Sequence, residues 1–210
     1  ALMETGEGKR PFPKAQPPHS SEVGLWGKPT VLNNAETWAT VPKIIKNGAD
    51  WYAAMGNENA QGCKVWAIAG NIKYNGLMEL DMKTTLREAI DDFCGGIQKK
   101  KALKVVHVGG VTGGFLPPEK ADTPMDYESL LQEGVLMGQA SFSAYDDSAC
   151  VIDLALFSIG FNEGETCGKC TPCRIGLTLV KNKLVDIAEG RGKMEDLDKL
   201  EALCEEISQT

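Results

Sequence analysis

Three cysteines at intervals of three residues are the part of this sequence best suited to chemistry. Cys167, Cys170 and Cys173 fall within one short segment, and the cationic residues Lys169 and Arg174 lie among them. Thiolates with this spacing can ligate one cubane iron–sulfur cluster, which carries electrons. Nearby positive charge favours the thiolate form that binds iron. The segment therefore predicts a 4Fe–4S cluster with these three cysteines as ligands.

Two other interpretations of this cysteine loop remain open. Structural zinc sites usually combine two separate Cys-x2-Cys or Cys/His pairs, and the sequence has no second pair and no histidine close to the loop. Alternatively, the cysteines are ordinary core residues with no metal. Metal analysis and colour would separate zinc from iron, because zinc proteins are colourless.

Three cysteines leave one iron of a cubane without a protein ligand. Cys204 is one candidate for the fourth ligand, on a predicted helix whose apolar residues form one stripe: Met194, Leu197, Leu200, Leu203, Cys204 and Ile207. A cysteine in such a stripe is more often a core residue than a ligand. We therefore expect Cys204 to be buried, and its role as a ligand stays an open alternative.

Two segments resemble the FMN- and NADH-binding subunit of respiratory complex I, a family shared with NAD-reducing hydrogenases and NAD-dependent formate dehydrogenases. One is the cysteine loop from Glu165 to Gly176. The other is residues 24–37, which resemble the family's Gly-Leu-Trp-Gly-Lys-Pro-Thr-x-x-Asn-Asn-x-Glu-Thr segment. The resemblance covers nearly all of this chain but only about the C-terminal half of the family's protein. In the family the fourth cluster ligand follows the third by roughly forty residues, so we expect it beyond Thr210.

The resemblance implies an NADH dehydrogenase flavoprotein in which electrons pass from NADH through FMN to the 4Fe–4S cluster. It implies that Asn33, Asn34 and Thr37 line the FMN pocket, although these residues alone also fit an ordinary capped helix. The family's glycine-rich FMN and NADH loops lie upstream of the matching region. We therefore expect the 210-residue chain by itself to be inactive.

The implied partners are other subunits of a redox complex, among them a thioredoxin-like subunit with a 2Fe–2S cluster. An alternative function is a non-catalytic interaction and electron-relay module of an NAD(P)-reducing hydrogenase or formate dehydrogenase complex. Bound flavin in the purified protein would distinguish the first function from the second.

Composition excludes several classes of partner. The 210 residues carry a net charge of −7 with scattered Lys and Arg, which argues against nucleic acid and anionic membranes. No apolar stretch is long enough to insert into a bilayer. Seven cysteines, an odd number, fit a reducing compartment better than a disulfide framework. We expect the protein to be cytoplasmic, or peripheral on the cytoplasmic side of a membrane complex.

The order of predicted elements indicates an α+β chain in three parts. The resemblance implies that residues 1–61 are the C-terminal part of the FMN/NADH-binding domain. Residues 62–147 are predicted to form a ubiquitin-like β-grasp domain of the soluble-ligand-binding type, and residues 148–210 a helical bundle that carries the cysteine loop. The middle part is predicted from two strands, at 64–70 and 77–80, then a helix, then a strand at 103–108. The match to the soluble-ligand-binding type comes from the family resemblance.

Local signals set the expected helices. A capping box at Thr85 begins a helix that reaches about Cys94 and should bury Leu86, Ala89, Ile90 and Phe93. Pro42 is expected to separate two short helical turns before Gly48. The glycine-rich residues 109–114 are expected to form a structural turn rather than a phosphate loop, because no helix follows them.

The last third of the chain is expected to be helical. From Ser148 the residues are apolar on nearly every side of a helix, which predicts burial, and Cys150 is expected to pack there. Thr171 is expected to cap the helix that follows the cysteine loop, with Pro172 in its first position.

Overall fold

The structure is a computed structural model that describes residues 6–9 and 17–209. It confirms the expected α+β class. The chain comprises two compact units: a central unit, Val41–Ser158, and a terminal unit that combines Ala1–Thr40 with Ile159–Thr210. The division into residues 1–61, 62–147 and 148–210 stays a prediction.

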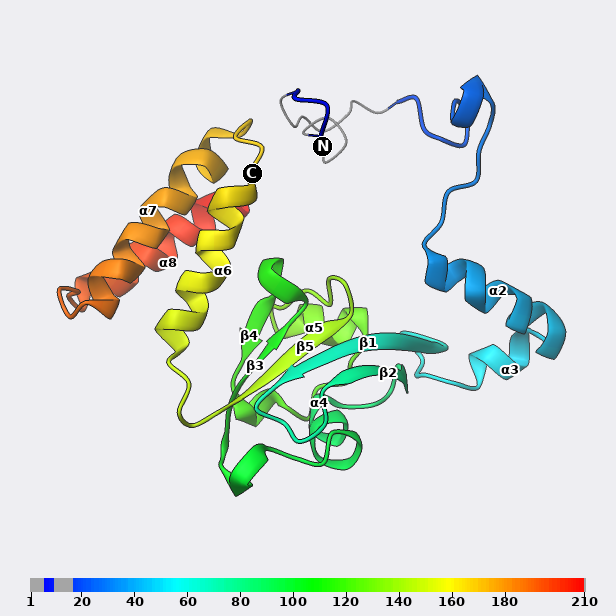
Figure 1. Cartoon of the computed structure of the whole chain (residues 1–210), viewed down its shortest axis with the longest axis horizontal. Helices are drawn as coiled ribbons and strands as arrows, with labels where there is room; N and C mark the ends of the chain where they lie inside the picture. The colour runs from blue at the N-terminus through cyan, green and yellow to red at the C-terminus, as the bar shows by residue number, and fades with distance from the viewer. Residues whose placement is uncertain (1–5, 10–16, 210) are drawn as a thin grey trace. The chain divides into compact units, whose positions relative to one another are not determined.

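A mixed five-stranded sheet organises the central unit (Figure 1). Its order is β2-β1-β5-β3-β4, where β1 pairs in parallel with β5 and all other neighbours are antiparallel. The strands are β1 Cys63–Gly70, β2 Gly76–Asp81, β3 Leu103–Val108, β4 Gly114–Leu116 and β5 Ser141–Asp146. The three strands predicted from the sequence are confirmed as β1, β2 and β3.

One face of the sheet forms the hydrophobic core. Along β1, Trp66 and Ile68 are buried while Val65 and Ala67 are exposed, because successive side chains point to opposite faces of a strand. The Trp66 ring packs against Phe142 of β5, with ring centroids 6.3 Å apart. Residues 65–69 are apolar throughout, so their composition predicts a strand but not which of its faces is buried.

The helix on this core begins with the predicted capping box. The Thr85 hydroxyl accepts from the Glu88 N–H at 3.1 Å, and the Glu88 carboxylate accepts from the Thr85 N–H at 2.9 Å. After α4, Leu86–Glu88, the chain continues as a π-helical turn, η2, Ala89–Phe93.

Burial of Phe93 was predicted wrongly, since 51% of this side chain is exposed. The Cys94 N–H bonds the carbonyl of Ala89, five residues earlier, and this wider turn rotates Phe93 outward. Cys94 takes the buried position instead, beside Ile90 and the other predicted core residues of this helix, Leu86 and Ala89.

Short helical segments lie in the connections before and between the strands. The glycine-rich segment after β3 is a structural turn, as predicted: Gly109 has φ of 84°, and a Cβ there would lie 2.0 Å from the Leu136 carbonyl oxygen. The short segments are η1 Leu25–Gly27, η3 Gln98–Lys100, η4 Gly110–Thr112, η5 Pro118–Lys120 and α5 Tyr127–Gln132.

Two consecutive helices precede the sheet, α2, Ala35–Asn47, and α3, Ala49–Ala53. The expected break at Pro42 is wrong, because Pro42 lies inside one continuous helix. Helical hydrogen bonds on both sides of the proline, from Trp38 to Asn34 and from Gly48 to Ile44, maintain the helix. Gly48, with φ of 93°, separates α2 from α3.

Three helices follow β5: α6 Val151–Glu165, α7 Thr171–Ala188 and α8 Glu195–Ser208. The expectation that α6 is buried is wrong in the described structure, where Phe157 and Phe161 are 66% and 47% exposed. Cys150, expected to pack, is also exposed. Apolar composition on all sides predicts burial only when neighbouring elements cover every side.

Within the described residues, no helix has the length and apolarity needed to cross a bilayer.

Candidate metal centre

The three predicted cluster ligands lie where α6 gives way to α7. Cys167 and Cys170 are in the connecting loop and Cys173 is in the first turn of α7. Cys167 and Cys173 are half-buried, whereas Cys170 is exposed. The prediction that Thr171 caps α7 is wrong, because Cys170 has the extended backbone of an N-cap and Thr171 is already helical.

Hydrogen bonds fold the cysteine loop back onto the start of α7. The Thr166 hydroxyl lies 3.2 Å from the Cys173 sulfur and accepts from the Gly168 N–H at 3.3 Å. The Arg174 guanidinium donates to the Gly168 carbonyl at 2.5 Å and to the Thr171 hydroxyl at 3.4 Å. The loop thus has an ordered backbone with a cation at its edge.

The chemistry of this loop fits an anionic thiolate cluster. Cys170 makes no side-chain capping bond at the start of α7, so the first backbone N–H groups of an 18-residue helix lack a side-chain cap at that position. Such a helix end attracts negative charge, and Arg174 adds to the attraction. Among the described residues, however, no three Cys, His, Asp or Glu side chains are placed as ligands of one metal ion. The three thiols are present in one loop, but they do not converge on one metal position.

Cys204 does not take the core position expected for it, because its side chain is exposed. The inward stripe of α8 instead contains the buried Asp196 and the half-buried Leu200, Leu203 and Ile207. Asp196 is buried because its carboxylate pairs with Lys183 of α7 at 2.9 Å. The inward face thus keeps Leu200, Leu203 and Ile207 of the expected stripe but contains Asp196 in place of Leu197 and leaves Cys204 outside.

Helices α7 and α8 pack closely at the end that carries the cysteine loop. A Cβ on Gly176 would lie 2.6 Å from the Ile207 side chain. Together with the Lys183–Asp196 pair, this contact makes the two helices antiparallel. The C-terminal end of α8 therefore lies beside the N-terminal part of α7.

The predicted flavin residues lie at the start of α2. Asn33, Asn34 and Thr37 are all exposed. The Asn34 carbonyl accepts from the Trp38 N–H at 3.1 Å, which begins the helix. The three side chains are thus accessible to a ligand. That they line the FMN pocket stays a prediction.

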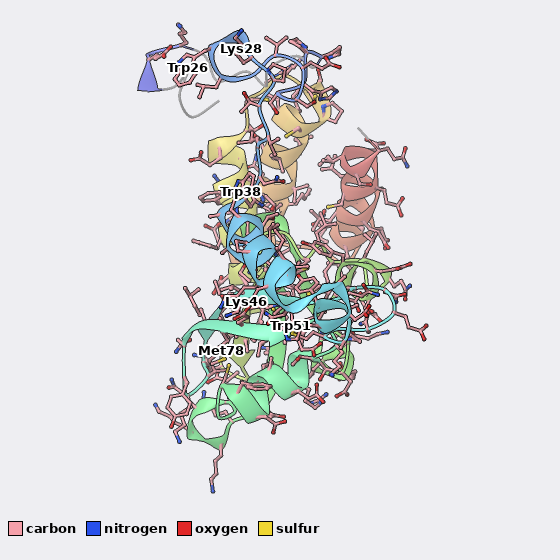
Figure 2. All side chains as sticks on the ribbon, turned by 90° about the vertical axis from the view of Figure 1, so that its right-hand side faces the viewer. Trp26, Lys28, Trp38, Lys46, Trp51 and Met78 are labelled. Atoms are coloured by element: carbon pink, nitrogen blue, oxygen red, sulfur yellow. The ribbon has the colours of Figure 1, made fainter. Side chains whose placement is uncertain are left out.

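A self-contained loop precedes this helix. The Gly24 N–H bonds the Lys28 carbonyl at 2.8 Å, and the Leu25 N–H bonds the Thr30 hydroxyl at 2.9 Å. Trp26 has φ of 53° and is 87% exposed (Figure 2). The sequence motif that resembles the family therefore folds locally, through bonds within residues 24–30.

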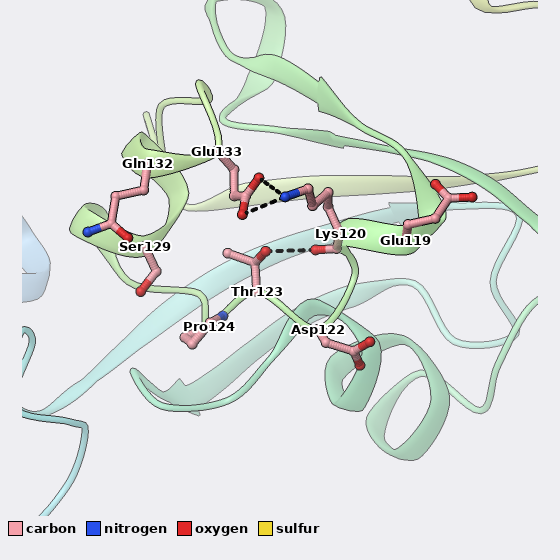
Figure 3. Close-up of a pocket in the computed structure, with 8 residues that line it drawn as sticks. All are labelled: Glu119, Lys120, Asp122, Thr123, Pro124, Ser129, Gln132 and Glu133. Atoms are coloured by element: carbon pink, nitrogen blue, oxygen red, sulfur yellow. Dashed lines mark hydrogen bonds and ion pairs between the residues drawn. The ribbon is translucent and has the colours of Figure 1, made fainter.

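A polar pocket of about 330 Å³ lies between η5 and α5 (Figure 3). Its main charges already neutralise one another, since the Lys120 ammonium lies 2.9 and 3.1 Å from the two carboxylate oxygens of Glu133. The Thr123 hydroxyl donates to the Lys120 carbonyl at 2.8 Å. The ion pair connects η5 to the end of α5 and occupies Lys120, the one cation among the residues that line this pocket.

Comparisons with known proteins match the region that contains the cysteine loop to an iron–sulfur family. Residues 153–210 match the family described as the NADH-ubiquinone oxidoreductase-F iron–sulfur binding region. The NADP-reducing hydrogenase subunit HndC of Solidesulfovibrio fructosivorans is 44% identical over 210 residues, which are 100% of this chain and 43% of that protein. The NADH-quinone oxidoreductase F 2 subunit of Rhizobium meliloti (strain 1021) is 39% identical over 207 residues, 99% of this chain and 49% of that protein.

A solved structure extends the agreement to the fold. The crystal structure of an NAD+-reducing [NiFe]-hydrogenase in the H2-reduced state matches 97% of this chain and 34% of the hydrogenase chain. The TM-score is 0.77 and the sequence identity is 30%. The chain spans less than half the length of these relatives.

Proposed function

We propose that this chain, which belongs to one family with the F-type subunits of NADH-quinone oxidoreductase and the hydrogenase subunit HndC, carries electrons from NADH and FMN through a 4Fe–4S cluster. The observation that carries the proposal is the cysteine loop: three thiols at the uncapped start of α7, inside the region that matches an iron–sulfur binding family. When bound, such a cluster accepts and releases one electron at a time.

Cys167, Cys170 and Cys173 are the proposed protein ligands. The N-terminus of α7 and the Arg174 guanidinium offset the negative charge of the thiolates. The Thr166 hydroxyl, 3.2 Å from the Cys173 sulfur, is placed to hydrogen-bond a ligand sulfur, and such bonds tune the reduction potential of a cluster.

The fourth ligand is proposed to lie beyond Thr210. Ile207 lies beside Gly176, and α8 runs toward the start of α7. Helix α8 ends at Ser208, so the chain that follows leaves it close to the first turn of α7, which contains Cys173. Cys204 lies about one turn away on the opposite side of Ile207 and points outward. This geometry supports a later cysteine over Cys204.

Other parts of the chain are assigned to supporting roles. Asn33, Asn34 and Thr37 are proposed to form one wall of the FMN pocket in the full-length protein. The strand order of the sheet, with its first and last long strands parallel in the centre, supports a β-grasp domain of the soluble-ligand-binding type. Partners are proposed to be the other subunits of a cytoplasmic or membrane-peripheral redox complex, including a 2Fe–2S subunit.

Metal analysis of the full-length protein after anaerobic reconstitution with iron and sulfide tests the proposal. We expect Cys170→Ser to lower bound iron and sulfide sharply, whereas Cys150→Ser, an exposed cysteine outside the loop, should leave both unchanged. Circular dichroism would verify that both variants are folded. Stoichiometric zinc without sulfide in the protein as isolated, retained against added iron, would instead favour the structural zinc alternative.

A further inference from the structure

A second pocket, of about 470 Å³, lies in the central unit and takes no part in the proposed electron transfer. Its volume falls within the range of small-molecule sites. It is formed by α2, α3 and the β1–β2 hairpin, and its lining includes Lys43, Asn47, Trp51, Met55, Cys63 and Glu79. None of the predicted flavin or cluster residues belongs to this lining.

The walls of this pocket are fixed by contacts that α3 and the residues just after it make with β2 and the start of β1. The Asp81 carboxylate accepts from the Gly56 N–H at 2.6 Å, and the Gly62 N–H donates to the Met55 carbonyl at 2.6 Å. Gly62 leaves no room for a side chain, because a Cβ there would lie 2.1 Å from the Tyr52 ring. The cavity is therefore preformed rather than a gap between loose segments.

Two opposite charges in the pocket remain available to a ligand. Lys43 makes no ion pair among the described residues. The Cys63 thiol donates a hydrogen bond to Glu79 Oε1 at 3.0 Å. The other carboxylate oxygen, Oε2, is free to bind a ligand. The third charged group, Asp81, is already engaged by two backbone N–H groups and by the Lys83 ammonium at 3.3 Å.

The remaining lining is apolar or neutral. Trp51, labelled in Figure 2, is 42% exposed and offers an indole surface, and the Met55 thioether also lines the pocket. The Asn47 amide donates to the Lys43 carbonyl at 3.0 Å, so its own carbonyl oxygen is free to accept. The pocket thus combines one free cation, one free carboxylate oxygen, one amide acceptor and an aromatic wall.

We infer that this pocket binds a small zwitterion with an aromatic group, of the class of the aromatic α-amino acids. Lys43 would bind the ligand carboxylate, Glu79 and the Asn47 carbonyl would bind the ammonium, and the ligand ring would lie against Trp51. A phosphate ligand is disfavoured, because a dianion would face a single cation together with two carboxylates.

L-phenylalanine and three analogues test this chemistry by titration calorimetry on the chain itself. Phenethylamine lacks the carboxylate, 3-phenylpropionate lacks the ammonium and L-alanine lacks the ring. We expect each analogue to bind about tenfold more weakly than L-phenylalanine, or worse, because each loses one charge-assisted or aromatic contact. Equal binding of L-phenylalanine and phenethylamine would contradict the role of Lys43.

The Cys63 thiol provides a local readout that does not depend on heat of binding. L-phenylalanine should slow alkylation of Cys63 by iodoacetamide, because Cys63 lines the pocket. It should leave the exposed Cys150 unprotected in the same sample, as peptide mass spectrometry would measure. Alkylation of the buried Cys94 would reveal unfolding.

Matched variants complete the test. Lys43→Met should abolish the preference for L-phenylalanine over phenethylamine, whereas Lys46→Met, an exposed lysine on α2 outside the lining (Figure 2), should retain it. The melting temperature of each variant shows whether it is folded. Absence of both heat and Cys63 protection at millimolar L-phenylalanine in the folded wild-type chain would overturn the proposal.

Discussion

Gly109 and Gly134 both have left-handed backbone angles, with φ of 84° and 77°, but only Gly109 faces another backbone segment. A Cβ at Gly109 would lie 2.0 Å from the Leu136 carbonyl oxygen, whereas nothing lies within 4 Å of one at Gly134. We expect Gly134→Ala to lower the free energy of unfolding by about 1 kcal/mol, the conformational penalty alone. Gly109→Ala should lower it by about 2 kcal/mol or more, because a backbone clash is added.

Urea denaturation of the two glycine variants measures this difference. Gly109 opens the segment that superficially resembles a phosphate loop. Equal losses of stability for the two variants would show that the backbone contact with Leu136 does not constrain this turn.

Asp196 makes the stability of the α7–α8 pair depend on pH. Its hydrogen bond with Lys183 is the main cause that lowers the pKa of this carboxyl, and the Lys193 N–H contributes further. Because the folded pKa lies below the unfolded value of about 3.9, the contribution is complete above that value. It is lost as the pH falls through the folded pKa.

Substitution of Asp196 tests this dependence. We expect Asp196→Asn to lower the melting temperature at neutral pH and to reduce its further decline below about pH 4. Asp198→Asn, at an exposed position of the same helix, serves as the control. An acid profile of Asp196→Asn that follows the wild type would exclude Asp196 as the titrating group.

The types and spacing of the candidate ligands were visible in the sequence, but their surroundings were not. Cys204 looked like a core residue because its apolar neighbours repeat with helical spacing. The pair of the buried Asp196 with the half-buried Lys183 favours an orientation of α8 in which Cys204 is exposed. A contact between residues on different helices leaves no periodic signal in either helix.

Individual elements were predictable where the signal is local. The capping box at Thr85 and the short run of strand-forming residues in β1 both involve neighbours in sequence. Phe93 and α6 were predicted wrongly because burial depends on what packs against an element. A π-helical turn turns Phe93 outward, and α6 exposes Phe157 and Phe161 in the described structure.

Two substitutions in the same helix test this account of the element. Leu86 is fully buried, so Leu86→Ala should lower the free energy of unfolding by about 2–5 kcal/mol. Phe93 is 51% exposed, so Phe93→Ala should cost under about 1 kcal/mol. Urea denaturation followed by circular dichroism gives both values. A loss at Phe93 as large as that at Leu86 would mean that the helix presents the face expected from the sequence.

For the whole molecule, flavin binding tests the assignment of Asn33, Asn34 and Thr37. All three are exposed and provide one wall of the proposed pocket. We therefore expect the 210-residue chain to bind FMN weakly and to lack NADH dehydrogenase activity. Fluorescence titration with FMN measures the affinity, and submicromolar binding by this chain would contradict the proposal that the other walls lie elsewhere in the full-length protein.

The central claim is that the cysteine loop at the start of α7 holds a 4Fe–4S cluster. Low-temperature electron paramagnetic resonance of the reduced full-length protein tests it most directly, with Cys173→Ser, Cys204→Ser and Cys150→Ser compared to the wild type. The account predicts that the four-iron signal assigned to this loop is lost in Cys173→Ser and persists in the other two variants. A signal that survives Cys173→Ser unchanged, or that disappears in Cys204→Ser, would contradict it.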